Sequence, residues 1–241
     1  MRWSWRGLMV EHSVLPRNAD CGCFGRIMIG TLKSRLAKTP LGQVWTRLRT
    51  PGRLARQIAA WEAAGRPVPP PHAYKARTVR RYAERFSTPV LIETGAFYGD
   101  MVFAVRDRFD AVYTIELDVG LHREVQQRFA GDPRIHVLQG DSGQAIGQVL
   151  AQINGRCLFW LDAHYSGEGT ARAVLDSPIR AELRQIMMHP TIQPVILIDD
   201  ARCFNGSSGY PTVEELKANI LATRPDWTVE VQDDIVRAHA R

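Results

Sequence analysis

Short apolar runs alternate with helical stripes of apolar residues through the second two thirds of the chain. The runs occupy residues 89–93, 111–117, 135–139, 157–161 and 194–198, with Gly or Asp around them. Between the runs, apolar residues recur at helical spacing, as in Leu121, Val125 and Phe129. Buried strands that alternate with helices are typical of a parallel sheet with crossover helices. The pattern therefore predicts five parallel strands.

The C-terminal end of the chain has a different pattern. Residues 227–232 and 235–240 alternate like strands and are separated only by Asp233 and Asp234. So short a connection requires antiparallel pairing. Together with the five earlier runs, this hairpin predicts an α/β fold: a doubly wound, mostly parallel, seven-stranded Rossmann-like sheet closed by an antiparallel hairpin.

The N-terminal third has a weaker pattern. A helical stripe in 53–64 is followed by the Pro-rich break at 67–71, which marks a domain boundary. We expect three parts: residues 1–30, disordered or preceding a true start at Met28; a basic helical extension and linker, 31–71; and the α/β domain, 72–241.

The formal net charge of +6 is unevenly distributed. Residues 1–88 hold 17 Lys/Arg and 4 Asp/Glu, about +13, and the rest of the chain is about −7. A basic arm of this kind suits nucleic acid or an anionic membrane surface. No apolar stretch is long enough to span a membrane, and the four cysteines match no disulfide framework, so we expect a cytoplasmic protein.

The first strand of the α/β domain ends in a segment that suits a nucleoside ligand. Glu93, Gly95, Phe97 and Gly99 follow one another at alternate positions there. The glycines allow a tight turn and close approach of a ligand to the backbone. A carboxylate at Glu93 would repel a pyrophosphate by roughly 4 kcal/mol at 4 Å, but would attract an ammonium and a sulfonium. The segment therefore favours S-adenosylmethionine over NAD, the alternative being a turn with a capping Glu.

The next two strand ends carry further candidate cofactor ligands. Glu116 ends the second strand, where a carboxylate can accept hydrogen bonds from both ribose hydroxyls. Asp141 and Ser142 follow the third strand, where they can meet an adenine edge. The alternative for Ser142 is that it only caps the next helix.

Three aspartates follow the fourth and fifth strands. Asp162 ends one strand, and Asp199 and Asp200 end the next. Neighbouring parallel strands would bring these carboxylates together, and their repulsion favours proton uptake or a divalent cation. Oxygen ligands suit a hard cation such as Mg²⁺. The alternative is one helix cap and one solvated carboxylate.

Residues 89–206 resemble the catechol O-methyltransferase family and its bacterial relatives, which include sugar and macrolide O-methyltransferases. The resemblance is carried by Glu-Thr-Gly-Ala-Phe-Tyr-Gly-Asp at 93–100, by Thr-Ile-Glu at 114–116, by Ser142 and by the three aspartates. It implies a class I methyltransferase fold, S-adenosylmethionine as cofactor, and Mg²⁺ held by Asp162, Asp199 and Asp200. It also implies methylation of a hydroxyl on a small molecule or saccharide.

One position departs from that family. Its catalytic Lys falls three residues after the fourth-strand Asp, where this chain has Tyr165. His164 and Asp162 are the candidate catalytic residues that remain, because histidine has a suitable pKa and a metal-bound hydroxyl is acidified.

Three other classes stay open. The basic arm would suit a nucleic-acid methyltransferase, although the chain has neither an Asn/Asp-Pro-Pro-Tyr segment nor a Pro-Cys nucleophile. A non-catalytic protein that keeps the fold is the second. NAD oxidoreduction is the third, and Glu93 disfavours it.

Overall fold

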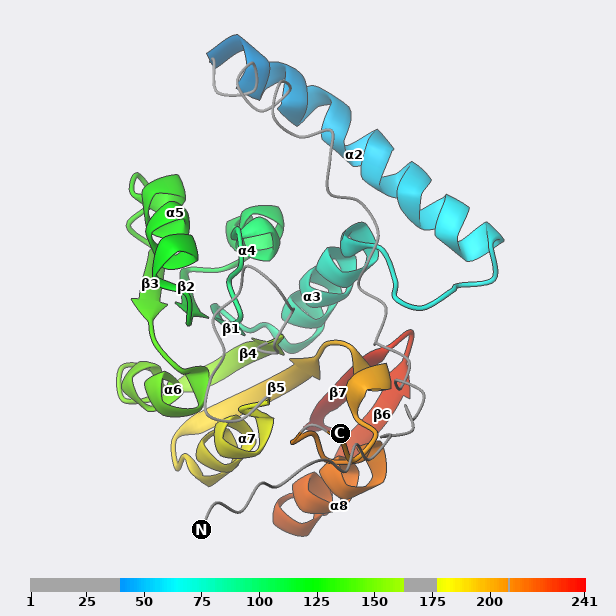
Figure 1. Ribbon diagram of the computed structural model, residues 1–241, viewed down its shortest axis with the longest axis vertical. Helices are drawn as coiled ribbons and strands as arrows, with labels where there is room; N and C mark the ends of the chain where they lie inside the picture. Colours follow the sequence, from blue (N-terminus) through cyan, green and yellow to red (C-terminus); the bar gives the residue numbers. More distant parts are fainter. Residues whose placement is uncertain (1–39, 163–176, 208) are drawn as a thin grey trace, which may run out of the picture.

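The computed structural model describes residues 40–162, 177–207 and 209–241 (Figure 1). His164 and Tyr165 therefore lie outside the described residues. In chain order the elements are α2 (Pro40–Ala63), α3 (His72–Phe86), β1 (Val90–Thr94), α4 (Asp100–Val105), β2 (Ala111–Glu116), α5 (Val119–Phe129), β3 (Ile135–Gln139), α6 (Ser142–Leu150), β4 (Gly155–Leu161), α7 (Ile179–Met188), β5 (Ile192–Ile198), α8 (Val213–Thr223), β6 (Trp227–Gln232) and β7 (Ile235–Ala240). None of the helices in these ranges is long and apolar enough to cross a bilayer.

The sheet has seven strands in the order β3-β2-β1-β4-β5-β7-β6, and only β7 runs against the others. Helices α3, α4 and α5 cover one face, and α6, α7 and α8 cover the other (Figure 1). The predicted doubly wound sheet is confirmed, with strand bounds within two residues of those expected. The short helix α4 was not predicted, because six residues give too little helical period.

Strand β4, in the middle of the sheet, shows why an apolar run forms a buried strand. In β4, Leu158 and Trp160 face the layer of α3 to α5, while Cys157, Phe159 and Leu161 face the layer of α6 to α8. All five side chains are buried. A strand covered by helices on both faces needs apolar residues at every position, which is the continuous run that the sequence shows.

The C-terminal hairpin turns through two residues with left-handed backbone. Asp233 has φ 51° and Asp234 has φ 62°, as in a two-residue turn of type I′. Asp233 also accepts a hydrogen bond from the Tyr74 hydroxyl of α3. The hairpin is thereby tied to the helix that precedes the first strand.

Packing continues across the Pro-rich break. Ile58 and Trp61 of α2 are buried in the same core cluster as α3, and the Trp61 and Tyr74 rings lie 4.5 Å apart. The Trp61 indole donates to the Pro67 carbonyl at 2.7 Å. Leu54, earlier in α2, is 36% exposed. Side chains on both sides of the break therefore contact one another, and the division of the chain at residues 30 and 71 stays a prediction.

Candidate active site

The strand order reverses between β1 and β4. From β1 the chain builds outward to β2 and β3 on one side, and from β4 to β5 and the hairpin on the other. Helices leave these two halves on opposite faces, so a crevice opens beyond the carboxyl ends of β1 and β4. The described candidate residues lie at or just beyond the carboxyl ends of β1 to β5.

The loop after β1 turns back over the end of β2. The amides of Gly95 and Ala96 both donate to the carbonyl of Ile115, at 3.0 and 3.1 Å. Gly95 and Gly99 have φ 81° and 74°, which side chains rarely adopt. At Gly99 a Cβ atom would also lie 2.7 Å from the Phe129 ring. Both glycines are thus required by the backbone, as the sequence predicted.

Glu93 is a buried acid with a shifted pKa. Its carboxyl is 1% exposed and accepts a hydrogen bond from the Thr114 hydroxyl. Burial, together with the charges of Asp162 and Glu116, raises the pKa of Glu93 to about 8. We expected a carboxylate here, whereas a pKa of about 8 favours the protonated form at neutral pH. A cation placed beside Glu93 would favour loss of the proton.

Glu116 lies at the end of β2 and holds the loop after β1. Its two carboxylate oxygens accept from the amides of Phe97, at 2.7 Å, and Asp118, at 2.9 Å. Each oxygen keeps a lone pair for a further donor such as a ribose hydroxyl. Phe97 itself has φ 49°, and its side chain is 49% exposed to solvent. Its ring contacts the ring of Tyr98.

Asp141 and Ser142 both have structural partners. Asp141 is the N-cap of α6 and accepts from the Gly143 amide at 2.8 Å, so the capping role belongs to Asp141. Ser142 is buried and its hydroxyl lies against Glu182 of α7. Burial raises the pKa of Glu182 to about 7, and sequence reasoning missed this acid because it falls within an ordinary helical stripe. Contact of Asp141 and Ser142 with adenine stays a prediction.

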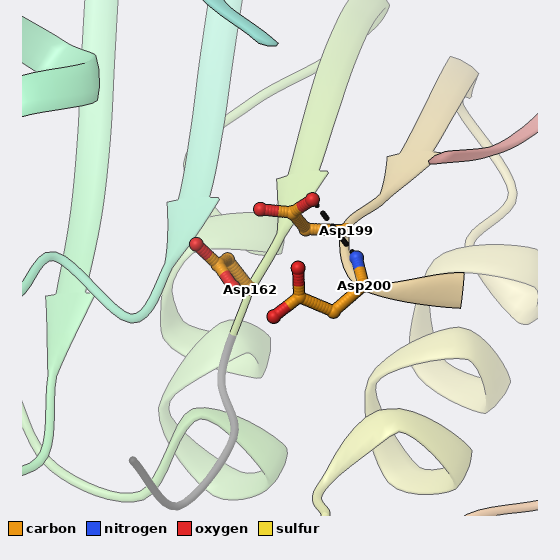
Figure 2. A group of neighbouring side chains, drawn as sticks. All are labelled: Asp162, Asp199 and Asp200. Atoms are coloured by element: carbon orange, nitrogen blue, oxygen red, sulfur yellow. Dashed lines mark hydrogen bonds between the residues drawn. The ribbon is translucent and has the colours of Figure 1, made fainter. Parts of the chain in front are cut away.

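The structure brings the three aspartates together at the ends of β4 and β5. Leu161 pairs with Ile198 in register, so Asp162 and Asp199 follow their strands side by side. One oxygen of each aspartate, Asp200 included, lies within 4.8 Å of the others, and Figure 2 shows the three carboxylates converging. The Asp200 amide donates to Asp199 Oδ1 at 2.8 Å, which fixes the orientation of that carboxylate.

A lysine that the sequence did not reveal lies against this cluster. Lys75 of α3 forms ion pairs through Nζ with Asp199 Oδ2 and with Asp200 Oδ1, the latter at 3.1 Å. Burial by itself lowers the pKa of Lys75, but the charges of Asp199 and Asp200 raise it well above its ordinary value. The ammonium therefore stays charged. On the other side, Arg202 donates to the same Asp200 oxygen at 2.8 Å.

These contacts bear on whether a divalent cation fits. Asp199 and Asp200 already share an ammonium, and a dication 4 Å from that ammonium would be repelled by roughly 8 kcal/mol at an effective dielectric of 20. With Lys75 in this position, the donor set does not fit Mg²⁺. The expectation of a metal at Asp162, Asp199 and Asp200 is therefore not supported by the geometry.

Within the part of the chain that the structure describes, His72 is a further candidate for the general base. His72 lies one helical turn before Lys75 at the start of α3, and burial lowers its pKa, with the charges of Asp100 and Asp162 acting in the opposite direction. His72 was not among the site residues that the sequence predicted.

Comparison with known proteins agrees with the topology. A scan against protein-family models found no match, and a search of curated proteins found none either. Solved structures do match. An O-methyltransferase from Bacillus cereus in complex with SAH has a TM-score of 0.54 at 13% identity, covering 87% of this chain and 100% of that chain. A SAH-bound methyltransferase from Podospora anserina has 0.51 at 13%, covering 90% and 100%. A putative O-methyltransferase from Klebsiella pneumoniae has 0.51 at 14%, covering 86% and 96%.

The chain has the fold of the class I methyltransferases. At these identities the likeness extends to the fold alone. Within that fold, acids from both halves of the sheet lie at the carboxyl ends of the strands, and Lys75 of α3 is paired with two of them.

Proposed function

We propose that this protein transfers a methyl group from S-adenosylmethionine to a hydroxyl of a small molecule or saccharide. The observation that carries the proposal is the division of charge about the crevice. Glu93 and Glu116 lie at the ends of β1 and β2, and an acid cluster with its own cation lies beyond β4 and β5. The first group suits a cationic nucleoside, and the second suits an acceptor that must lose a proton.

The residues on the β1 and β2 side fit the cofactor. Glu116 can accept from ribose hydroxyls through lone pairs that the amides of Phe97 and Asp118 leave available. Glu93 provides a buried carboxyl that a neighbouring ammonium or sulfonium would ionise. Gly95 keeps the backbone close to the crevice without a side chain.

For this reaction the protein needs mainly to orient the acceptor and to stabilise the charge that develops on it. When bound, S-adenosylmethionine supplies an electrophilic methyl group on sulfur. A bond forms between the acceptor oxygen and this carbon as the carbon–sulfur bond breaks, and the hydroxyl proton passes to a base. Asp162 lies at the end of β4, where it can take that proton, and His164 stays a second prediction for this role. Orientation of the acceptor oxygen toward the methyl carbon then contributes to the acceleration.

Calorimetric titration of the full chain with S-adenosylmethionine tests the proposal. We expect one binding site, and binding weakened roughly tenfold or more in Glu116→Gln, because one of the two acceptor oxygens is replaced by an amide donor. Glu124→Gln, an exposed acid on α5, is the matched control and should bind like the wild type. Absence of binding heat in the wild type would contradict the proposal and favour a non-catalytic protein.

A further inference from the structure

We infer that the ammonium of Lys75 takes the place of a divalent cation between Asp199 and Asp200, so that methyl transfer in this protein needs no metal ion. The inference about the reaction rests on the proposed function. The inference about the cluster does not, because it follows from the contacts of Lys75 alone.

The contacts define where the ammonium lies. Lys75 Nζ bridges the two carboxylates that end β5, and its side chain is only 15% exposed. Asp199 is still more deeply buried, so withdrawal of the ammonium would leave a buried carboxylate without its counter-ion. Arg202 forms ion pairs with both Asp200 and Asp234. Two cations of the chain itself, Lys75 and Arg202, are thus paired with this cluster.

Helix α3 is held in the position that this bridge requires. The residue before Lys75 is Tyr74, whose hydroxyl donates to Asp233 of the hairpin turn, and the residue after it is the buried Ala76. One turn later, Val79 is fully buried against the sheet. Because both neighbours of Lys75 are fixed, its Cα cannot retreat from the cluster without disrupting the core.

The bridge leaves capacity for a ligand. An ammonium has three N–H donors, and Asp199 and Asp200 take two of them in the part of the chain that the structure describes. The third donor can stabilise negative charge on an acceptor oxygen in the crevice, which is what a metal ion would otherwise do. Lys75 is therefore assigned as a catalytic residue that replaces the metal.

Manganese titration of the metal-stripped full chain tests the inference, with free Mn²⁺ followed by electron paramagnetic resonance. We expect no stoichiometric binding to the wild type, because the ammonium occupies the cluster. Lys75→Met removes the charge and keeps the apolar stem, so it should bind one Mn²⁺ at least roughly tenfold more tightly than the wild type. Adding Asp199→Asn to Lys75→Met should abolish that binding.

Two further variants complete the design. Lys75→Arg keeps the positive charge and should exclude Mn²⁺ as the wild type does. Lys217→Met removes an exposed lysine of α8 and should leave Mn²⁺ binding unchanged. Circular dichroism of each variant checks that it is folded.

Two outcomes would overturn the inference. One is a wild type that binds one Mn²⁺ and loses it on Asp199→Asn, a result that does not depend on whether Lys75→Met folds. The other is a folded Lys75→Met variant that binds no Mn²⁺. Neither outcome depends on the titration with S-adenosylmethionine. A failure of the proposed function would therefore be recognised separately.

Discussion

At the scale of single residues, the site is defined by buried acids whose charge depends on what lies beside them. Glu93 and Glu182 are buried and have pKa values raised to about 8 and about 7. Asp199, no less buried, instead has the Lys75 ammonium in contact. Burial and the charge of Asp162 raise the pKa of Asp199 as well, and the Lys75 ammonium opposes that shift. The position of a carboxyl was predictable, but its protonation was not, since burial depends on the packing of distant elements.

The raised pKa of Glu93 predicts how stability varies with pH in the ligand-free protein. The carboxyl contributes fully below about pH 4.5 and loses this contribution as the pH rises through about 8, because only the unfolded chain gives up the proton readily. Glu93→Gln should therefore match the wild type near pH 5 and exceed it above pH 8, by at most about 5 kcal/mol. Urea unfolding at the two pH values measures the difference, and an equal offset at both would show that Glu93 ionises normally.

At the scale of elements, strand ends and the loop after β1 shape the crevice. The apolar periods predicted the seven strands, and in the structure a capping box of Thr212 and Glu215 begins α8. Helix α4 went unpredicted, although it starts directly after the glycine that the turn requires. Local spacing can show that Gly99 belongs to a turn, but only the folded chain shows that the Phe129 ring occupies the space where a side chain would be.

Gly99→Ala tests this junction between β1 and α4. The substitution adds a Cβ at φ 74° and places it 2.7 Å from the Phe129 ring, so it should destabilise the protein by about 1–3 kcal/mol. Gly131→Ala is the matched control, because no atom lies within 4 Å of its added Cβ and its φ is not positive. Chemical denaturation compares the two. Equal unfolding midpoints would mean that the loop after β1 adapts without cost.

At the scale of the whole molecule, α2 joins the α/β domain through its last turns. Trp61 is 7% exposed and packs on Tyr74, the neighbour of Lys75, whereas Leu54 on the same helix is 36% exposed. The Pro-rich break predicted a domain boundary because prolines stiffen the chain. Composition does not show which side chains contact one another across the break. The helix that ends before the break thereby supports the helix that carries the cation.

Trp61→Ala should lower the free energy of unfolding by about 3–5 kcal/mol, as expected for a buried aromatic residue. Leu54→Ala should cost less than about 1 kcal/mol, since its side chain is already partly in water. Thermal and urea unfolding of both variants make the comparison. If the two variants were equally stable, α2 would not be part of the cooperative unit.

The sequence by itself determined the order and type of the elements and the positions of acids at the strand ends, because apolar periodicity and turn residues act over a few neighbours. Tertiary structure decided which strands lie side by side, where the crevice opens and which cation meets the aspartates. Lys75 and Asp199 are 124 positions apart, and their contact depends on how α3 crosses the sheet. No local pattern carries that information, since it arises only when the two layers of helices pack against the strands.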